Sequence, residues 1–79
     1  SINISTLERE FETVVQQLAA ATNASKLSKA RYDGGVTSYL EVLDSDRQLF
    51  QIELYHSELM QRRLTAYTNL YKVLGGGWI

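Results

Sequence analysis

The fold is decided by residues 30–49, A-R-Y-D-G-G-V-T-S-Y-L-E-V-L-D-S-D-R-Q-L. Gly34 and Gly35 can adopt the positive φ angles that end a helix, and such angles strain other residues. Ser38 then stands three residues before Glu41, which is the spacing of a capping box at a new helix start. A stop signal followed at once by a start signal predicts the tight turn of a helical hairpin.

The charges on either side of this turn fit two helix ends. Cations near the end of a helix and carboxylates near its start both complement the helix dipole. The last turns before the glycines carry Lys26, Lys29 and Arg31, and the first turns after Ser38 carry Glu41, Asp44 and Asp46.

The first helix is predicted over about residues 6–33. Ser5 and Glu8 have the spacing of a second capping box, which places the helix start at Ser5. Apolar and small residues then recur in steps of alternately four and three, a heptad pattern that predicts a coiled-coil partner. Small residues in the middle of this pattern predict a close approach of the partner helix. The pattern consists of Leu7, Phe11, Val14, Leu18, Ala21, Ser25, Ser28 and Tyr32.

The second helix is predicted over about residues 39–74, after a tip at 34–38 and before a glycine-rich tail at 75–79. Its apolar residues occupy more than one stripe, whereas a helix with a single neighbour needs only one. We therefore expect contacts on more than one side. One stripe holds Leu40, Leu43, Phe50, Leu54, Leu64 and Tyr71, and a neighbouring one holds Tyr39, Val42, Leu49, Met60, Tyr67, Leu70 and Leu74.

The composition of the chain excludes several classes of function. The 79 residues form one domain, an all-α antiparallel two-helix coiled-coil hairpin, and a net charge of −1 argues against nucleic acid as a partner. The sequence contains no run of about 18 apolar residues, so we expect no membrane-spanning helix. We also expect no signal peptide. Cysteine is absent and His56 is the only histidine, so we expect neither a metal site nor a cofactor. Without a nucleophile–histidine–acid grouping or a phosphate-binding loop, we expect no enzyme.

Residues 31–50, together with the ending L-Y-K-V-L-G-G-G-W at 70–78, carry a family resemblance. They resemble the last helical hairpin of the TolC-type outer-membrane factors, the exit ducts of Gram-negative tripartite efflux pumps. The likeness is closer to the branch that serves drug and metal-ion exporters, and it covers most of residues 24–78. It implies that the chain is a fragment of a periplasmic helical barrel, in a parent located in the outer membrane. Membrane contact is then made only by other parts of that parent.

The resemblance also implies roles for individual residues. Glu41 and Asp44 are expected to line the channel entrance, and Tyr32 to form hydrogen bonds at the gate. The expected partners are a periplasmic adaptor (membrane fusion protein) and, indirectly, an inner-membrane pump, with the parent a homotrimer. The tip that docks the adaptor is expected to comprise Gly34, Gly35, Val36, Thr37 and Ser38.

From the residues alone, other interpretations stay open. The tip also fits an ordinary helix–helix turn, and the two acids fit solvated residues that complement the dipole. Asp46 and Arg47 are expected to face a neighbouring helix, and Trp78 to fold back onto an apolar surface. The alternative function is a free-standing structural or interaction module in which two hairpins form a four-helix bundle.

Overall fold

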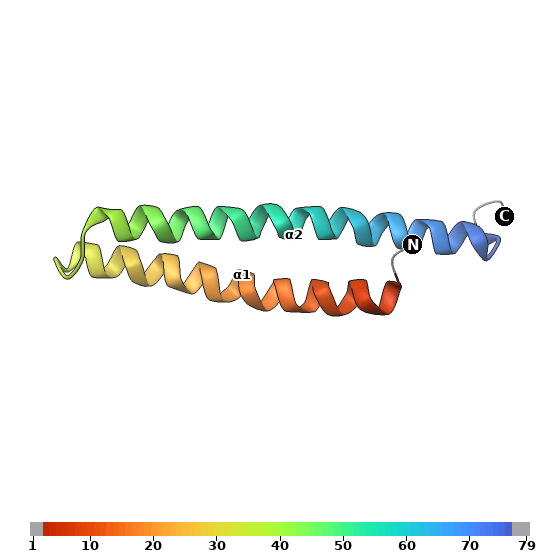
Figure 1. The fold of residues 1–79 in the computed structure, drawn as a ribbon, viewed down its shortest axis with the longest axis horizontal. Coiled ribbons are helices and arrows are strands. Elements are labelled where there is room, and N and C mark those ends of the chain that lie inside the picture. Colours follow the sequence, from red (N-terminus) through yellow and green to blue (C-terminus); the bar gives the residue numbers. More distant parts are fainter. Residues whose placement is uncertain (1–2, 77–79) are drawn as a thin grey trace.

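The computed structural model describes residues 3–76, which form two antiparallel helices lying side by side (Figure 1). Helix α1 spans Ile4–Asp33 and helix α2 spans Tyr39–Val73, with a short turn between them. The hairpin measures 61 × 19 × 17 Å, and α2 runs on past the start of α1. The predicted all-α antiparallel hairpin is confirmed. Neither helix is apolar over a stretch long enough to cross a membrane.

The start of α1 differs from the prediction. Asn3 has extended backbone angles, and its side-chain oxygen accepts a hydrogen bond from the Ser5 backbone N–H at 2.8 Å. Asn3 is thus the N-cap, Ser5 already lies inside the helix, and Glu8 binds Arg63 of the other helix. The expected Ser5–Glu8 capping box is wrong, because asparagine caps at least as well as serine and stands two residues earlier.

The turn after α1 is a Schellman motif. The Val36 N–H donates to the Arg31 carbonyl at 2.8 Å and the Gly35 N–H donates to the Tyr32 carbonyl at 2.9 Å. Gly35 has a φ of 74°, the left-handed conformation that this motif requires, whereas Gly34 has a φ of −81°. One glycine of the pair therefore supplies the positive φ that reverses the chain.

The start of α2 lies where the sequence indicated, but its capping differs. Ser38 is the N-cap residue, and its carbonyl accepts the Glu41 N–H at 3.2 Å, yet its side chain makes no capping hydrogen bond. The Glu41 carboxylate binds Arg31 of α1. The expected Ser38–Glu41 capping box is therefore wrong, because a guanidinium on the other helix provides a charged donor for Glu41.

The heptad pattern of α1 is the face that packs on α2. Leu7, Val14, Ser25 and Ser28 are buried, with 0–7% of their surface exposed. Phe11, Leu18 and Ala21 are partly buried, so the small middle of the pattern lies inside the interface. Tyr32 is 44% exposed, which ends the buried pattern at Ser28.

The matching face of α2 takes Val42 and Leu49 from the second of the two predicted stripes, together with Ile52, Leu59 and Ala66, which lie in neither. Leu59 is fully buried and forms the core with Leu7 and Val14 of α1, while Val42 is buried near the turn. The residues of α2 that are buried or partly buried on this side again step by three and four, which is the coiled-coil pattern. The apolar members are Val42, Leu49, Ile52, Leu59 and Ala66.

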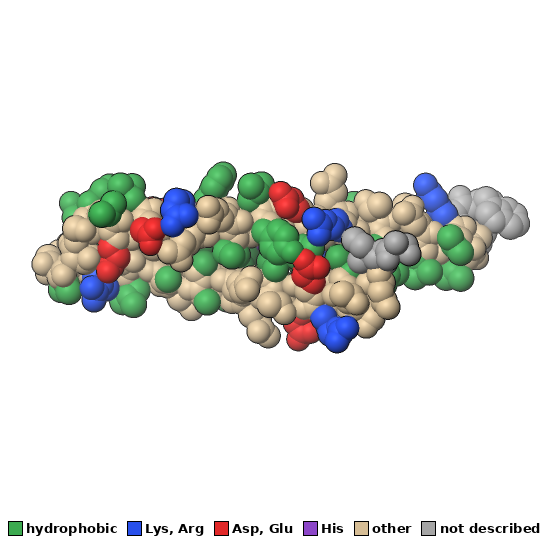
Figure 2. Space-filling model, in the orientation of Figure 1, with side chains coloured by type: hydrophobic (Ala, Val, Ile, Leu, Met, Phe, Trp, Pro, Cys, Tyr) green, Lys and Arg blue, Asp and Glu red, His purple; other side chains and the backbone are tan. Residues whose placement is uncertain are grey.

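A second apolar surface of α2 points away from α1 (Figure 2). We call it the outer stripe, and its members are between 51% and 72% exposed. Several are separated by multiples of seven residues, so they share one face of the helix. Contacts on more than one side of α2 stay a prediction. The outer stripe consists of Leu40, Leu43, Phe50, Leu54, Leu64 and Tyr71.

Glycine ends α2 as the sequence indicated. The Gly75 N–H donates to the Lys72 carbonyl at 3.0 Å, and Gly75 has a φ of 79°. A Cβ added at Gly76 would lie only 2.5 Å from the ring of the exposed Tyr71, so a side chain at this position requires that ring to move. The rest of the predicted tail, including Trp78, lies outside the described residues.

We predict that Leu59→Ala lowers the free energy of unfolding of the hairpin by about 2 kcal/mol or more, because it opens a cavity at a fully buried site. Leu64→Ala removes the same atoms from a side chain that is 69% exposed and should cost less than about 0.5 kcal/mol. Urea unfolding followed by circular dichroism measures both. Equal losses for the two variants would contradict the burial described above.

Candidate functional site

The candidate site comprises the tip, residues 34–38, and the first turns of α2. Val36 is 66% exposed, and a Cβ added at Gly35 would meet no atom within 4 Å. Thr37 is partly buried, while Gly34 and Ser38 are exposed. The backbone at the tip is therefore open to solvent and accessible to another chain.

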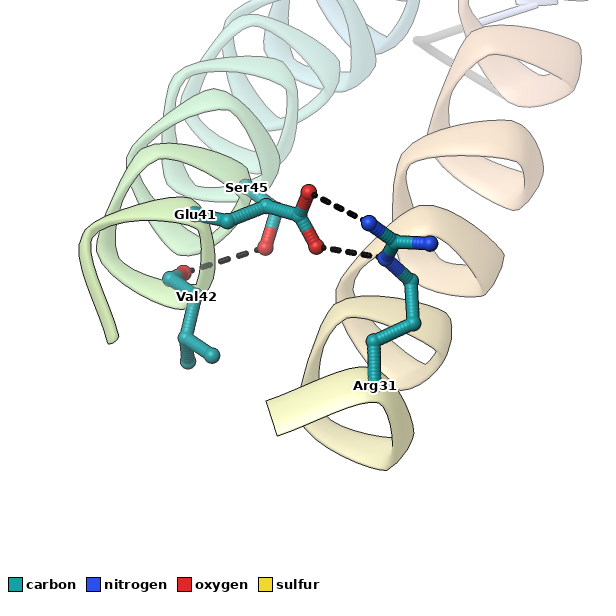
Figure 3. A network of polar contacts seen from close by, with 4 residues as sticks. All are labelled: Arg31, Glu41, Val42 and Ser45. Atoms are coloured by element: carbon teal, nitrogen blue, oxygen red, sulfur yellow. Dashed lines mark hydrogen bonds and ion pairs between the residues drawn. The ribbon is translucent and has the colours of Figure 1, made fainter. Parts of the chain in front are cut away.

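Glu41 forms an ion pair that bridges the two helices just behind the tip (Figure 3). The Arg31 Nε atom lies 2.9 Å from one carboxylate oxygen of Glu41, and the Arg31 Nη2 atom lies 3.4 Å from the other. A hydrogen bond from Arg31, followed by the attraction of its charge, lowers the pKa of Glu41. Both side chains are about 40% exposed, so water partly screens the pair.

Asp44 binds a different arginine, on its own helix. Arg47 donates to one carboxylate oxygen of Asp44 at 2.7 Å, and Gln48 donates to the other at 2.9 Å. The hydrogen bond from Arg47 lowers the pKa of Asp44. Arg47 thus pairs with a carboxylate one turn earlier on α2, and its expected position facing a neighbouring helix stays a prediction. Glu41 and Asp44 share one side of α2, but each carboxylate turns to its own arginine.

Asp44 begins a row of polar residues that runs along α2. Its members are spaced seven residues apart, and residues at that spacing share one face of a helix in a coiled coil. All five members are exposed. We call the row the polar stripe. It lies between the outer stripe and the side that packs on α1. Its members are Asp44, Gln51, Glu58, Thr65 and Lys72.

Tyr32 packs across the base of the tip. Its ring meets the Tyr39 ring edge to face, with 5.1 Å between their centres. Such aromatic pairs favour this geometry, so Tyr39 fixes the direction of Tyr32. The two rings join the last turn of α1 to the first turn of α2.

Asp46 faces α1 and meets a buried serine there. Ser25 is only 3% exposed, and its hydroxyl donates a hydrogen bond to Asp46 Oδ1 at 2.7 Å. The Lys29 ammonium lies 3.5 Å from the same oxygen. This hydrogen bond, with the Lys29 charge a smaller contribution, lowers the pKa of Asp46. The neighbouring helix that Asp46 was expected to face is thus α1.

A second polar cluster lies toward the other end of the hairpin. Arg63 binds Glu8 through two nitrogens, at 2.5 and 3.0 Å, and its guanidinium carbon lies 4.1 Å above the Phe11 ring. The hydrogen bond from Arg63, followed by the attraction of its charge, lowers the pKa of Glu8. His56 packs on Phe11, with 5.2 Å between the centres of the two rings. His56 therefore belongs to the interface between the helices.

Sequence reasoning missed Arg31 as the partner of Glu41 and Ser25 as the partner of Asp46. The available signal was the antiparallel register. Both pairs are symmetric about the Gly35–Val36 peptide bond: Ser25 stands as far before Gly35 as Asp46 stands after Val36, and the same holds for Glu8 and Arg63. Counting outward from the turn would have paired them.

The comparisons with known proteins bear on what this hairpin belongs to. The family described as outer membrane efflux protein matches residues 1–76. The chain belongs to the outer membrane efflux protein family. It is 42% identical to the outer membrane protein OprJ of Pseudomonas aeruginosa, over 92% of this chain and 15% of that protein. It is 38% identical to the pyoverdine export outer membrane protein OpmQ of the same species, over 96% of this chain and 16% of that protein.

A third relative, the solvent efflux pump outer membrane protein SrpC of Pseudomonas putida, is 50% identical over 66% of this chain and 11% of that protein. The chain therefore spans only about a sixth or less of the length of these relatives. No solved structure matches it significantly. Family membership places the protein in the cell outer membrane, and a hairpin of two water-exposed helices fits the periplasmic part of such a protein.

We predict that acid destabilises the hairpin. Lowered pKa values in the folded state mean that ionised carboxylates stabilise it above the ordinary values of 4.5 for glutamate and 3.8 for aspartate. This stabilisation is lost as the pH falls through the lowered values, so the urea midpoint should drop between about pH 5 and about pH 2. The groups responsible are Glu8, Glu41, Asp44 and Asp46.

Ser25→Ala provides a test at one of these groups. It removes the main cause of the lowered pKa of Asp46, which should therefore rise toward 3.8 in a carboxyl NMR titration. Ser57→Ala, at an exposed position of α2, is the matched control and should leave this pKa unchanged. An unchanged Asp46 titration in Ser25→Ala would contradict the assigned hydrogen bond.

Proposed function

We propose that the chain is the tip-forming hairpin of an outer-membrane efflux duct. In this proposal three copies of the parent protein assemble a periplasmic helical barrel, through which a tripartite pump expels its cargo. The hairpin conducts passively and performs no chemistry, so the proposal assigns it no enzymatic activity. Membership of the efflux family supports this role, as do the export functions in the names of two relatives.

The observation that carries the proposal is the distribution of surfaces around α2. One side packs on α1, the outer stripe is apolar and exposed, and the polar stripe faces water. A helix in a closed ring needs this arrangement, because it has a neighbour on either side and water on a remaining face. An isolated helix pair gains nothing from an outer stripe of six exposed apolar side chains.

The channel entrance is proposed to lie at the end of the polar stripe that is nearest the tip. Asp44 stands at that end, and Glu41 lies one turn closer to the tip on the same side. In a threefold assembly each of these positions would form a ring of carboxylates. A ring of this kind in a narrow opening concentrates negative potential and attracts cations.

The tip is proposed to dock the periplasmic adaptor. Residues 34–38 expose their backbone, and the glycine at position 35 leaves open space beside it. An adaptor helix can approach such a surface closely. Tyr32, held by Tyr39 at the base of the tip, is proposed to hydrogen-bond to a partner outside this chain in the closed gate.

The cargo is proposed to be small organic compounds such as drugs, or metal ions. The names of relatives refer to pyoverdine export and to solvent efflux, which supports small organic molecules as one class. The drug and metal-ion classes come from the resemblance of residues 31–50 to that branch of the family.

The alternative function, a module that pairs into a four-helix bundle, rests on the same outer stripe. Two hairpins could bury these side chains against each other instead of against neighbouring helices of a ring. The two functions differ at the tip, because a bundle makes no use of an exposed turn. A substitution at the tip therefore separates them.

We predict that Gly35→Trp in the full-length protein weakens binding of the cognate adaptor by at least about tenfold, because the indole fills the space in which the adaptor docks. Gly35→Ala carries the same backbone strain at a φ of 74° but little bulk, so it serves as the matched control and should bind nearly normally. Surface plasmon resonance measures both, and circular dichroism checks the fold. Equal binding by wild type and Gly35→Trp would refute docking at the tip.

A further inference from the structure

The acids proposed to line the entrance are not free charges. Glu41 binds Arg31 through two nitrogens, and Asp44 binds Arg47. Each carboxylate thus has a guanidinium within hydrogen-bonding distance. The field at the entrance then depends on how firmly each arginine holds its acid, as well as on the number of acids.

The two ion pairs differ in construction. Arg31 lies on α1 and Glu41 on α2, so their bidentate contact joins the last turn of one helix to the first turn of the other (Figure 3). Arg47 and Asp44 are three residues apart on one exposed helix face, with side chains 59% and 53% exposed. A pair within one exposed helix is screened by water and salt and rearranges readily. Glu41 and Arg31 are less exposed, at 38% and 43%.

Geometry also favours the first pair as the more permanent one. Planar guanidinium and carboxylate groups that meet through two parallel hydrogen bonds fix each other's direction. Tyr32 and Tyr39, which lie near the pair on either side of the tip, meet edge to face and form a second contact between the two helix ends. The Glu41 carboxylate is therefore held toward α1 by Arg31, and the tyrosine pair adds a second contact between the same two helix ends.

We propose that Arg31 is a specificity-determining residue of the entrance, which cancels the charge of Glu41 and leaves Asp44 as the acid that attracts cations. This inference rests on the proposed function, because it needs both acids at the entrance of an assembled duct. Arg31 acts through Glu41 and is a positioning residue.

The test uses the full-length trimer in planar lipid bilayers, with the K⁺ to Cl⁻ permeability ratio obtained from the reversal potential in a KCl gradient. Arg31→Gln frees Glu41 in every subunit and should raise this ratio by roughly twofold. Glu41→Gln alone should lower it, since Arg31 is then uncompensated. The double variant Arg31→Gln/Glu41→Gln has the net charge of the wild type and should restore the wild-type ratio.

Two further variants separate charge from structure. Arg31→Lys keeps the positive charge without the bidentate geometry and should stay near the wild-type ratio, even if it loosens the tip. Arg63→Gln breaks a bidentate pair of the same type with Glu8, toward the opposite end of the hairpin, and should leave the ratio unchanged. A rise in Arg63→Gln equal to that in Arg31→Gln would overturn the inference, since the effect would then report general loosening.

Asp44→Asn distinguishes failure of this inference from failure of the proposed function. If Asp44→Asn lowers the ratio while Arg31→Gln leaves it unchanged, the proposed position of Asp44 at the channel entrance is supported and the role of Arg31 is refuted. If neither variant changes the ratio, both the entrance and the inference are refuted. If Arg31→Gln does not assemble, the exchange Arg31→Glu/Glu41→Arg keeps the pair and must give the wild-type ratio, and any other ratio rejects charge cancellation.

Discussion

Packing of α1 on α2 along a single heptad stripe holds this hairpin together. Leu7, Val14 and Leu59 form its buried centre, and burial of each such side chain contributes roughly 1.5–3 kcal/mol. Two helices can cover only one side of each other, so the core is narrow and the chain is small. The same geometry leaves the outer stripe of α2 exposed. The exposed outer stripe is thus a direct consequence of α1 covering only one side of α2.

Polar contacts within the interface fix how the helices are aligned. Ser25 meets Asp46 nearer the tip, and Glu8 meets Arg63 toward the other end. A shift of one helix along the other would separate both pairs and leave the hydroxyl of buried Ser25 without Asp46, which carries a cost. Apolar packing supplies most of the attraction, because such exposed or half-exposed ion pairs contribute little by themselves. Alignment in turn determines that Arg31 lies opposite Glu41, and hence how much charge the tip presents.

Local features of the fold could be predicted from the sequence, whereas features that depend on both helices could not. The turn at Gly35 and the α1 face from Leu7 to Ser28 follow from nearest neighbours and spacing. The capping boxes failed because Asn3 competes with Ser5 and because Arg31, distant in sequence, binds Glu41. The side of α2 that packs on α1 was ambiguous, since apolar residues surround most of that helix. The roles proposed for the tip and the entrance depend on other chains, which no single hairpin contains.

The central claim is that α2 contacts neighbouring helices through its outer stripe and water through its polar stripe. Because the hairpin contains no cysteine, Phe50→Cys and Gln51→Cys each add one thiol to one of these two adjacent surfaces, and any cysteine elsewhere in the full-length protein is first replaced by serine. Maleimide labelling of each variant in the assembled full-length protein measures exposure directly. We expect position 51 to react rapidly and position 50 to be protected, although both react in the isolated hairpin, where Phe50 is 66% exposed. Equally rapid labelling of both positions in the assembled protein would contradict a ring of helices.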